Sequence, residues 1–477
     1  MSQDLDKAKN LFLKSLDAQF LGDLTQANKY LNDALKLAPS RKSIINNLLI
    51  INFTLKDLKS IQNLLNHIIS LDDNYKNLSD LGRVQILFLQ KDYLKVIEIS
   101  NEILKRNDVE ILDQCYDLLI KSYFKTGDLN KLFKYLRLSL KMNLNHEQSL
   151  YNAGSILQYV SKPRAAIYFL KKSLKYRDNI SYHSCLAQSY LKIKNFEEGF
   201  KYWESRLYLY NYNIEIINSI KSIKSIYELK DKKILIIFEQ GLGDTLNFSR
   251  YVKLLKNYSS NIYFTVQDKL LEIFQNFDDT IKIISTNDSK TQKFDFKIPL
   301  VSLIKLLNQN YKNISYHQLH IPQIATPIDL KIGKYNIAYA HQGNSDYICD
   351  QFRSIPLNIF SRIFENKKAN FFNLGKNEQF NNLNNLKDIS HLNFLEISNF
   401  IKKVNLVIST DTVFVHLCGI LNIKCILLLN KNAEWRWFNH SKKTVWYPSI
   451  RILKQSKIGN WDKEISTIKK FIKMKTQ

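Results

Sequence analysis

Apolar residues recur at helical spacing through the first 200 residues of the chain. Stretches such as 27–35, 111–124 and 181–193 carry apolar side chains three to four positions apart, which predicts amphipathic helices. A short turn recurs between the helices at positions 22, 56, 91, 127, 162 and 194, so the turns are 32 to 36 residues apart. One helix pair cannot bury its apolar face alone, so this interval predicts pairs that stack into a solenoid with a concave surface.

The repeat resembles the tetratricopeptide repeat. Its best matches are Gly22…Ala27…Ala34…Pro39 and Gly127-Asp128-Leu129…Leu140. The resemblance implies a helical array over residues 1–220 whose concave surface binds a peptide or protein segment. A spacer or a dimerisation arm is the alternative. In the last repeat, at 194–206, aromatic residues cluster around Trp203, which predicts a large interface with the domain that follows.

From residue 231 the pattern changes to short apolar runs that alternate with helical stretches. The runs of strand length and composition are 233–238, 261–266, 281–284, 336–340, 370–374, 405–409 and 424–429. Helices are predicted at 246–256, 269–274, 356–364, 394–402, 413–421 and 461–472. Such alternation predicts parallel, doubly wound sheets.

The predicted fold is therefore α + α/β, with an α-solenoid at 1–220 followed by two Rossmann-type α/β lobes. The first lobe is predicted at 231–330 and the second at 333–477, facing each other across a cleft. In open α/β sheets ligands bind at the carboxyl ends of the strands. The loops that follow the predicted strands are therefore the candidate sites.

Gly241, Gly243 and Asp244 lie in the loop after the first predicted strand. Glycines there let backbone amides approach a ligand, or allow a tight turn. Asp244 is a carboxylate at the mouth of the cleft that could take a proton from an acceptor hydroxyl. Capping of the next helix is the alternative, because Asp is a good N-cap. Leu246 stands where a dinucleotide fingerprint requires glycine, which argues against nicotinamide binding.

Asp411, Thr412 and His416 lie where the strand at 405–409 gives way to a helix. Hydroxyls, a helix N-terminus and an imidazole form a candidate cradle for a diphosphate. A capping role for Asp411 and a buried core position for His416 are the alternatives. In the loop after strand 336–340, Arg353 offers a fork of donors that suits phosphate, and a surface salt bridge is its alternative.

Several strings occur in order and make a family resemblance specific. They are Glu239-Gln240-Gly241-Leu242-Gly243-Asp244-Thr245 with Phe248-x-Arg250-Tyr251, Arg353-Ser354-Ile355-Pro356-Leu357, Asp411-Thr412-x-x-x-His416-Leu417-x-Gly419, Trp435-Arg436-Trp437 and Trp446-Tyr447-Pro448. Together they resemble bacterial tetratricopeptide-repeat proteins whose C-terminal half is similar to the family 9 (heptosyltransferase) glycosyltransferases. The resemblance covers most of the chain.

The resemblance implies a GT-B glycosyltransferase that takes a nucleotide sugar as donor, needs no metal or other cofactor, and inverts the anomeric carbon. Asp244 matches the base proposed for that family. Asp411, Thr412 and His416 match the segment that meets the donor diphosphate, and Gly241, Gly243 and Arg353 are further donor-side candidates. The chemistry agrees, since displacement at the anomeric carbon needs one base and positive dipoles on the leaving diphosphate.

Three departures from the family pattern lie near these residues. Val413, Phe414 and Val415 are larger than the small residues usual there, which predicts a narrower cradle. His341 replaces a small residue before Gly343-Asn344, and Asn430 stands where proline is common.

A net charge of +25, from 69 basic and 44 acidic residues, suggests a nucleic-acid or anionic-membrane partner. The charge is not concentrated, since residues 1–230 carry 34 basic and 24 acidic residues (+10) and residues 231–477 carry 35 and 20 (+15). Most of it is lysine beside abundant asparagine and isoleucine, as AT-rich coding produces. Arginine, which reads phosphates and bases best, is scarce. We therefore expect no nucleic-acid partner, while peripheral contact with an anionic membrane stays open.

The five cysteines are far apart in the sequence, which predicts reduced thiols rather than disulfides or a zinc site. The N-terminal residues are charged where a signal peptide would be apolar, and no apolar run approaches the ~20 residues of a membrane span. We expect a cytoplasmic glycosyltransferase that acts on a protein or a cell-envelope glycan, with the repeats recruiting the acceptor or a partner. The alternative is a non-catalytic scaffold for protein–protein interaction with a degenerate GT-B domain.

Overall fold

The computed structural model describes residues 2–20, 22–71, 73–106, 111–142, 147–209, 212–330, 333–344, 350–375, 384–438 and 442–477. The chain divides into two compact units, Met1–Ala153 and Gly154–Gln477. The finer boundaries near 220, 231 and 330 stay predictions.

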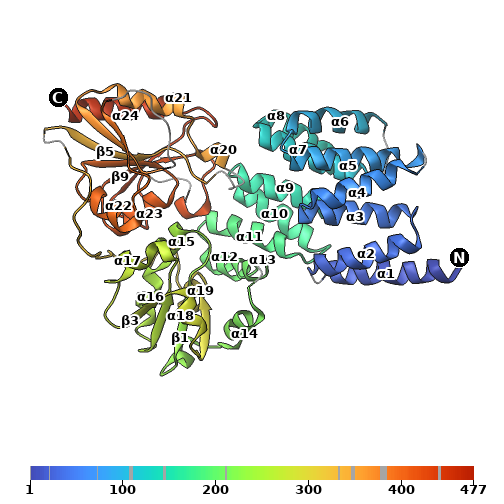
Figure 1. The fold of residues 1–477 in the computed structure, drawn as a ribbon, viewed down its shortest axis with the longest axis horizontal. Helices are drawn as coiled ribbons and strands as arrows, with labels where there is room; N and C mark the ends of the chain where they lie inside the picture. Colours follow the sequence, from blue (N-terminus) through green and yellow to red (C-terminus); the bar gives the residue numbers. More distant parts are fainter. Residues whose placement is uncertain are drawn as a thin grey trace. The chain divides into compact units, whose positions relative to one another are not determined.

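The N-terminal unit is built of antiparallel helix pairs, visible in blue and cyan in Figure 1. Its buried core is made by leucine, isoleucine and small alanine side chains, among them Ala27, Leu31 and Ala34, which are fully buried. The helices are α1 (Ser2–Phe20), α2 (Leu24–Leu37), α3 (Lys42–Leu55), α4 (Leu58–Ile69), α5 (Lys76–Leu89), α6 (Tyr93–Arg106), α7 (Leu112–Thr126) and α8 (Leu129–Met142), with α9 (Glu147–Tyr159) crossing into the next unit.

Four of the recurring turns share one geometry. The first residue has a left-handed φ, with values of 82°, 58°, 67° and 79° at Gly22, Lys56, Lys91 and Gly127. The next residue is an aspartate whose side chain accepts a hydrogen bond from a backbone N–H three residues on, at 2.9–3.3 Å. The left-handed residue ends one helix and the aspartate caps the next. The predicted repeat is confirmed, and in these four turns the predicted residues carry it.

The C-terminal unit begins with the continuation of the repeats. Its helices are α10 (Pro163–Leu174), α11 (Ile180–Lys192), α12 (Phe196–Trp203), α13 (Arg206–Leu209) and α14 (Ile214–Ser222). The aromatic side chains of α12 pack on the segment after β9 (Cys425–Leu429): Phe200 and Trp203 lie 5.8 and 6.3 Å from Trp435 between ring centroids. The predicted aromatic interface with the α/β region is therefore confirmed.

The first lobe contains a four-stranded parallel sheet of order β3-β2-β1-β4. Its strands are β1 (Ile234–Ile237), β2 (Ile262–Thr265), β3 (Ile281–Ile284) and β4 (Phe296–Pro299). Short helices connect them, namely α15 (Leu242–Phe248), α16 (Arg250–Leu255), α17 (Leu271–Phe274), α18 (Thr286–Lys290) and α19 (Ser302–Leu306).

The second lobe contains a six-stranded parallel sheet of order β10-β9-β8-β5-β6-β7. Its strands are β5 (Tyr335–Ala340), β6 (Ala369–Asn373), β7 (Leu386–Asp388), β8 (Leu406–Thr410), β9 and β10 (Ile450–Lys454). The helices are α20 (Asp350–Arg353), α21 (Leu357–Phe360), α22 (Phe394–Ile401), α23 (Val413–Ile420) and α24 (Asp462–Lys475).

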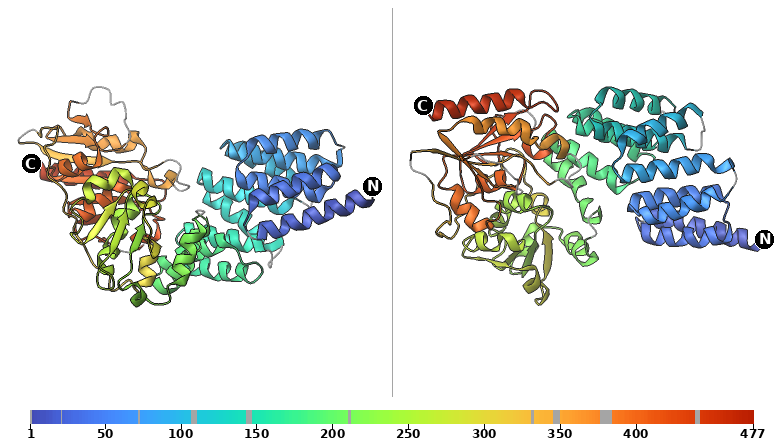
Figure 2. Two further views of the ribbon diagram at one scale, coloured as in Figure 1. Left: turned by 60° about the horizontal axis from the view of Figure 1, so that its bottom comes forward. Right: turned by 45° about the horizontal axis from the view of Figure 1, so that its top comes forward.

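Helices cover both faces of the six-stranded sheet, with α21 and α24 on one side and α22 and α23 on the other (Figures 1 and 2). Alternate side chains of β5 therefore pack into the hydrophobic cores on opposite faces of the sheet. Ile337 and Tyr339 pack with α24, whereas Ala338 and Ala340 belong to the core that includes α22 and α23. The predicted doubly wound α/β architecture is confirmed.

No helix of the described residues is both long and apolar enough to cross a bilayer. Among those residues no group of three or more His, Cys, Asp or Glu side chains is arranged to hold a metal ion. Cys115, Cys418 and Cys425 are buried and Cys185 is half-buried, while Cys349 lies outside the described residues.

Candidate functional site

The carboxyl ends of β5 and β8 lie side by side where the strand order of the larger sheet reverses. The chain leaves β5 towards β6 on one side, while β8 and β9 follow on the other, so the loops after β5 and β8 separate and open a crevice. Two predicted donor-side residues meet there. The guanidinium Nη1 of Arg353, in α20, donates to the backbone carbonyl of Asp411 at 3.0 Å.

Arg353 is held by a network within its own loop. Its Nε and Nη2 donate to Oδ1 of Asp350 at 3.1 and 2.9 Å, and Oδ2 of Asp350 accepts from the Ser354 hydroxyl at 2.8 Å. A Cβ at Gly343 would overlap the guanidinium, so a larger residue there would displace Arg353 from this position. The Arg353 side chain is only 16% exposed. Arg353 is therefore a positioned cation at the crevice, and the salt bridge that it forms with Asp350 is largely buried.

Thr412, not Asp411, caps helix α23. The Thr412 hydroxyl accepts from the N–H of Phe414 at 3.3 Å and lies 2.8 Å from the Ser409 hydroxyl. Burial, together with the nearby Glu434 carboxylate, raises the pKa of Asp411 to about 6, although Arg353 opposes this shift. The Thr410 hydroxyl, fully buried at the end of β8, has no partner within the described part of the chain.

His416 lies in the packing between the two lobes. Its Nδ1 is 3.0 Å from the Tyr447 hydroxyl and its ring stacks on Trp437 at 5.2 Å between centroids. Burial lowers its pKa to about 3, so the imidazole is neutral at physiological pH. A Cβ on Gly243 would lie 2.7 Å from Cδ2 of His416. The structure therefore places Gly243 and His416 against each other, where glycine permits the approach of α15 to α23.

Asp244 lies in the first turn of α15 and has two partners. Oδ2 accepts the N–H of Gly241 at 3.2 Å, so Asp244 is the third residue of a capping box rather than the N-cap foreseen as the alternative, and Oδ1 pairs with the Arg436 guanidinium. The Asp244 side chain is 16% exposed. Burial raises its pKa and Arg436 opposes that shift. The predicted base thus lies between the lobes with a cation beside it.

Arg436 and Glu434 were not predicted as site residues, although the Trp435-Arg436-Trp437 string pointed to this segment. Arg436 donates to Glu434 at 2.6 Å and to the Oε1 of Gln240 at 3.1 Å, besides its pair with Asp244. Its guanidinium also lies 4.8 Å above the Trp435 ring. Arg436 therefore connects the first-lobe carboxylate to Glu434 in the second lobe.

Several buried donors around this ion pair have no hydrogen-bond partner in the part of the chain that the structure describes. They are the side-chain nitrogens Gln240 Nε2, Asn247 Nδ2, Trp435 Nε1 and Arg436 Nε. An unsatisfied buried donor is costly and calls for water or a ligand.

The larger residues of α23 turn into the protein. Phe414 stacks on Phe394 with ring centroids 6.2 Å apart, and Val415 is fully buried. His341 is also buried, with Nδ1 2.6 Å from the carbonyl oxygen of Ile355. These departures from the family pattern are thus accommodated by packing.

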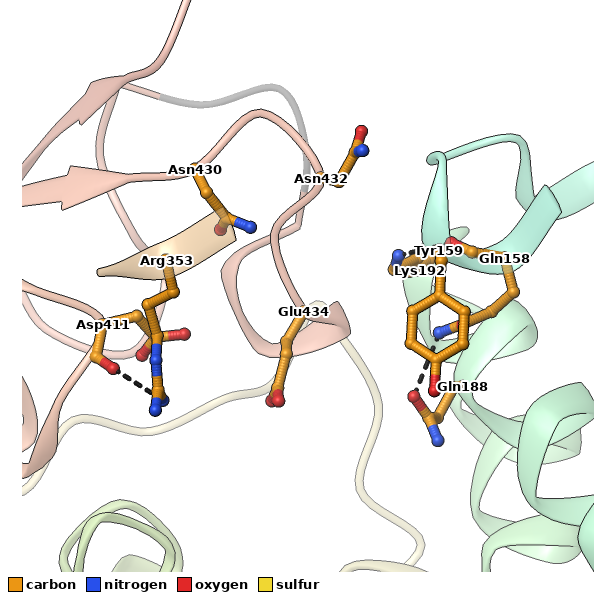
Figure 3. A pocket seen from close by; sticks show the side chains of 9 residues that line it. All are labelled: Gln158, Tyr159, Gln188, Lys192, Arg353, Asp411, Asn430, Asn432 and Glu434. Atoms are coloured by element: carbon orange, nitrogen blue, oxygen red, sulfur yellow. Dashed lines mark hydrogen bonds between the residues drawn. The ribbon is translucent and has the colours of Figure 1, made fainter. Parts of the chain in front are cut away.

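A small pocket, part of it open to solvent, lies at this crevice (Figure 3). One side, the lobe wall, consists of Arg353, Asp411, Asn430, Asn432 and Glu434. The other side, the array wall, consists of Gln158, Tyr159, Gln188 and Lys192 from α9 and α11. The predicted donor-side residues Arg353 and Asp411 therefore share a pocket with helices of the repeat array.

Comparison with known proteins found similarity in solved structures alone. No protein-family model and no curated protein matches the sequence. The structure of Pseudomonas aeruginosa PilF matches at 14% identity, over 46% of this chain and 100% of PilF, with a TM-score of 0.29. E. coli ADP-heptose lipopolysaccharide heptosyltransferase II matches at 10% identity, over 51% of this chain and 100% of its own, with a TM-score of 0.36.

The iron-containing heptosyltransferase TibC of enterotoxigenic E. coli, in complex with ADP-D-β-D-heptose, matches at 12% identity, over 49% of this chain and 66% of TibC, with a TM-score of 0.35. The solved structures similar to this chain thus include repeat proteins and heptosyltransferases, the two kinds named by the sequence resemblance. At such scores the fold assignment rests on the chain's own helix pairs and parallel sheets.

Proposed function

We propose that this protein is a glycosyltransferase that transfers a sugar from a nucleotide-sugar donor to a protein or cell-envelope glycan. One observation carries the proposal. A first-lobe carboxylate, Asp244, is joined through Arg436 to Glu434, and Glu434 lines the same second-lobe pocket as Arg353 and Asp411. A base on one lobe and a crevice with a positioned guanidinium on the other are what sugar transfer between two lobes requires.

In the proposed reaction Asp244 takes the proton from an acceptor hydroxyl as that oxygen attacks the anomeric carbon. The bond from the anomeric carbon to the diphosphate breaks, and the nucleoside diphosphate leaves with the electron pair. Arg353 and the N-terminal amides of α23 stabilise the charge that develops on it. A single displacement of this kind inverts the anomeric carbon. The chemistry needs no metal or other cofactor, and the acceptor or a partner would bind on the repeats in the cytoplasm.

Calorimetry with ADP-, GDP- and UDP-sugars tests the donor. We expect one nucleotide class to bind and Asp411→Ala to weaken its binding. Asp244→Asn should lower sugar transfer by about 100-fold or more while leaving the donor Kd within about 2-fold, as for loss of a general base. Absence of binding by every nucleotide sugar would refute the proposal.

A non-catalytic scaffold with a degenerate GT-B domain is the second candidate. The observation that favours it is the engagement of both Asp244 oxygens, by Gly241 and by Arg436. Pull-down through the repeats followed by mass spectrometry separates the two functions. An enzyme predicts added sugar on captured proteins, and a scaffold predicts capture of unmodified proteins that Asp244→Asn does not alter.

A further inference from the structure

The repeat array contributes directly to the pocket of the second lobe. Gln158 and Tyr159 end helix α9, and Gln188 and Lys192 lie in the last two turns of α11. All four line the pocket that also contains Arg353, Asp411 and Glu434 (Figure 3). A helical array that only recruited a partner would have no need to supply side chains here.

The array wall is fixed in position by its own hydrogen bonds. The Lys192 ammonium, on a side chain that is almost fully buried, donates to the backbone carbonyl of Gln158 at 2.7 Å. The Gln158 amide donates to Oε1 of Gln188 at 3.0 Å, a bond drawn in Figure 3. This bond uses the oxygen of Gln188, so its NH₂ group is left to donate to something else. The wall is pre-organised, which lowers the entropic cost of binding.

The chemistry of the two walls suits the hydroxyls of a sugar. The amides of Gln188 and Asn432 can each donate and accept, and the Glu434 carboxylate accepts from hydroxyls. A further phosphate is disfavoured beside Glu434, because like charges repel. Under the proposed function the diphosphate lies at Arg353 and α23, and the group bonded directly to that diphosphate is the transferred sugar.

We propose that the array wall binds the transferred sugar of the donor and that Gln188 is its specificity-determining residue. This inference rests on the proposed function. The repeats and the second lobe then form one donor site, and the sugar is selected between them. A site built to hydrogen-bond a sugar hydroxyl discriminates strongly against a ligand that lacks it.

The test compares an intact nucleotide sugar with the matching nucleoside diphosphate on the full-length protein. ADP-, GDP- and UDP-sugars are first screened by calorimetry on the wild type, and the best ligand is then titrated into Gln188→Met and Asn432→Ala. We expect each variant to bind the nucleotide sugar about 3- to 30-fold more weakly, as for one lost hydrogen bond with an exposed partner group. Binding of the bare nucleoside diphosphate should change by less than about 2-fold.

The nucleoside diphosphate also reports that the variants are folded. Gln275→Ala, the removal of an exposed glutamine at the end of α17, is the matched control and should leave both affinities unchanged. Equal weakening of both ligands would overturn the inference, because the wall would then bind the nucleotide. Unchanged donor binding with a raised KM for the acceptor would overturn it as well and assign the wall to the acceptor. A wild type that binds no nucleotide sugar would refute the proposed function itself.

Discussion

Arg436 balances the negative charges of the carboxylates in the site between the two lobes. It pairs with Asp244 and Glu434 and also acts on Asp411 through space. Burial raises the pKa of Asp244, and only the Arg436 guanidinium and local hydrogen bonds hold that carboxylate towards its ionised form. A base must be ionised to accept a proton. Arg436 therefore binds one oxygen of Asp244 and also keeps that carboxylate ionised, as a base must be.

Asp411 gives a pH-dependent stability that can be measured. Its pKa is raised from 3.8 to about 6 in the folded state, mainly by burial and by Glu434. The folded protein therefore binds more protons than the unfolded chain between these values, and the free energy of unfolding falls as pH rises from about 4 to about 6. We expect Asp411→Asn to raise the melting temperature relative to the wild type, by more at pH 7 than at pH 4.

Asp278 is the control of opposite sign. Burial acts to raise its pKa, but hydrogen bonds from Lys256 and Thr280 lower it to about 2. Its ionised form stabilises the folded state at pH values above about 4, and that stabilisation is lost as pH falls towards 2. Asp278→Asn should therefore lower the melting temperature at pH 7. Parallel curves for the wild type and Asp411→Asn across pH 4–7 would contradict the assignment for Asp411.

Substitutions at Gly243 and Gly241 distinguish a packing role from a ligand-binding role in the loop after β1. A Cβ at Gly243 would lie 2.7 Å from His416, whereas a Cβ at Gly241 meets nothing closer than Asp244 at 3.6 Å. We expect Gly243→Ala to lower the free energy of unfolding by about 1–3 kcal/mol through overpacking, and Gly241→Ala by less than about 1 kcal/mol. Urea denaturation measures both. Equal losses would mean that α15 and α23 are not held at this distance.

The residues that surround the site were predicted more completely than the contacts that each of them makes. Arg353 and Asp411 were predicted on the same side of the cleft and are in direct contact. At Gly243 the sequence could not show whether a ligand or a neighbouring side chain approaches the backbone, because either one requires a residue without a Cβ. Arg436 could not be paired with Asp244 from the sequence, because 192 residues separate them and only the packing of the two lobes joins them.

At the scale of elements, the strands that the hydrophobic pattern missed are all edge strands. β4 and β7 end their sheets on one side and β10 on the other. An edge strand buries fewer side chains, so charged residues interrupt its apolar run, as Arg451 does between the buried Ile450 and Ile452. The continuous runs at β1, β8 and β9 were predicted because both of their faces are covered.

The helix predicted at 246–256 begins earlier and is divided. α15 starts at Leu242 and α16 at Arg250, with Ser249 between them, whose hydroxyl bonds the carbonyl of Leu246 at 3.1 Å. The Gly-Leu-Gly string hid the first turn, since glycine has low helix propensity. The earlier start places Asp244 inside the first turn, where its carboxylate faces both Gly241 and Arg436.

The repeat turns predict a simple gain in stability. Lys56 has a left-handed φ of 58° where Gly22 and Gly127 stand in other repeats. A non-glycine residue in this left-handed conformation costs about 1–2 kcal/mol. Glycine removes that cost, but it also raises the conformational entropy of the unfolded chain, which cancels part of the gain. We expect Lys56→Gly to raise the free energy of unfolding by about 0.5–1 kcal/mol, measured by urea denaturation of the full-length protein.

Lys29, exposed in the middle of α2, provides the matched control. Lys29→Gly makes the same chemical change in right-handed helical backbone and should cost about 1 kcal/mol. A loss of stability in both variants would show that the turn at 56 does not hold a left-handed residue.

At the scale of the whole molecule, a buried ion pair ties the repeats to the first lobe. Nε and Nη2 of Arg206, after the last repeat, donate to the two carboxylate oxygens of Glu239 at 2.7 and 2.8 Å, and both side chains are fully buried. Glu239 also accepts the N–H of Val301 at 2.7 Å at the end of β4. Breaking such a pair from one side costs about 3–5 kcal/mol. The loop that carries Asp244 therefore starts from a point anchored by the repeat array.

This coupling predicts where the chain can be cut. Four large side chains of α11 and α12, Leu191, Phe196, Phe200 and Trp203, belong to the same core as the two lobes. Exposing them would cost about 6–12 kcal/mol at about 1.5–3 kcal/mol each, comparable with the whole stability of a domain. We expect residues 143–477 to unfold cooperatively and to bind nucleoside diphosphate with the Kd of the full chain, and residues 221–477 to aggregate or to lack a cooperative transition. Calorimetry and thermal melts of the two fragments decide this, and a soluble 221–477 fragment with an unchanged Kd would instead establish the sequence-based boundary near 220.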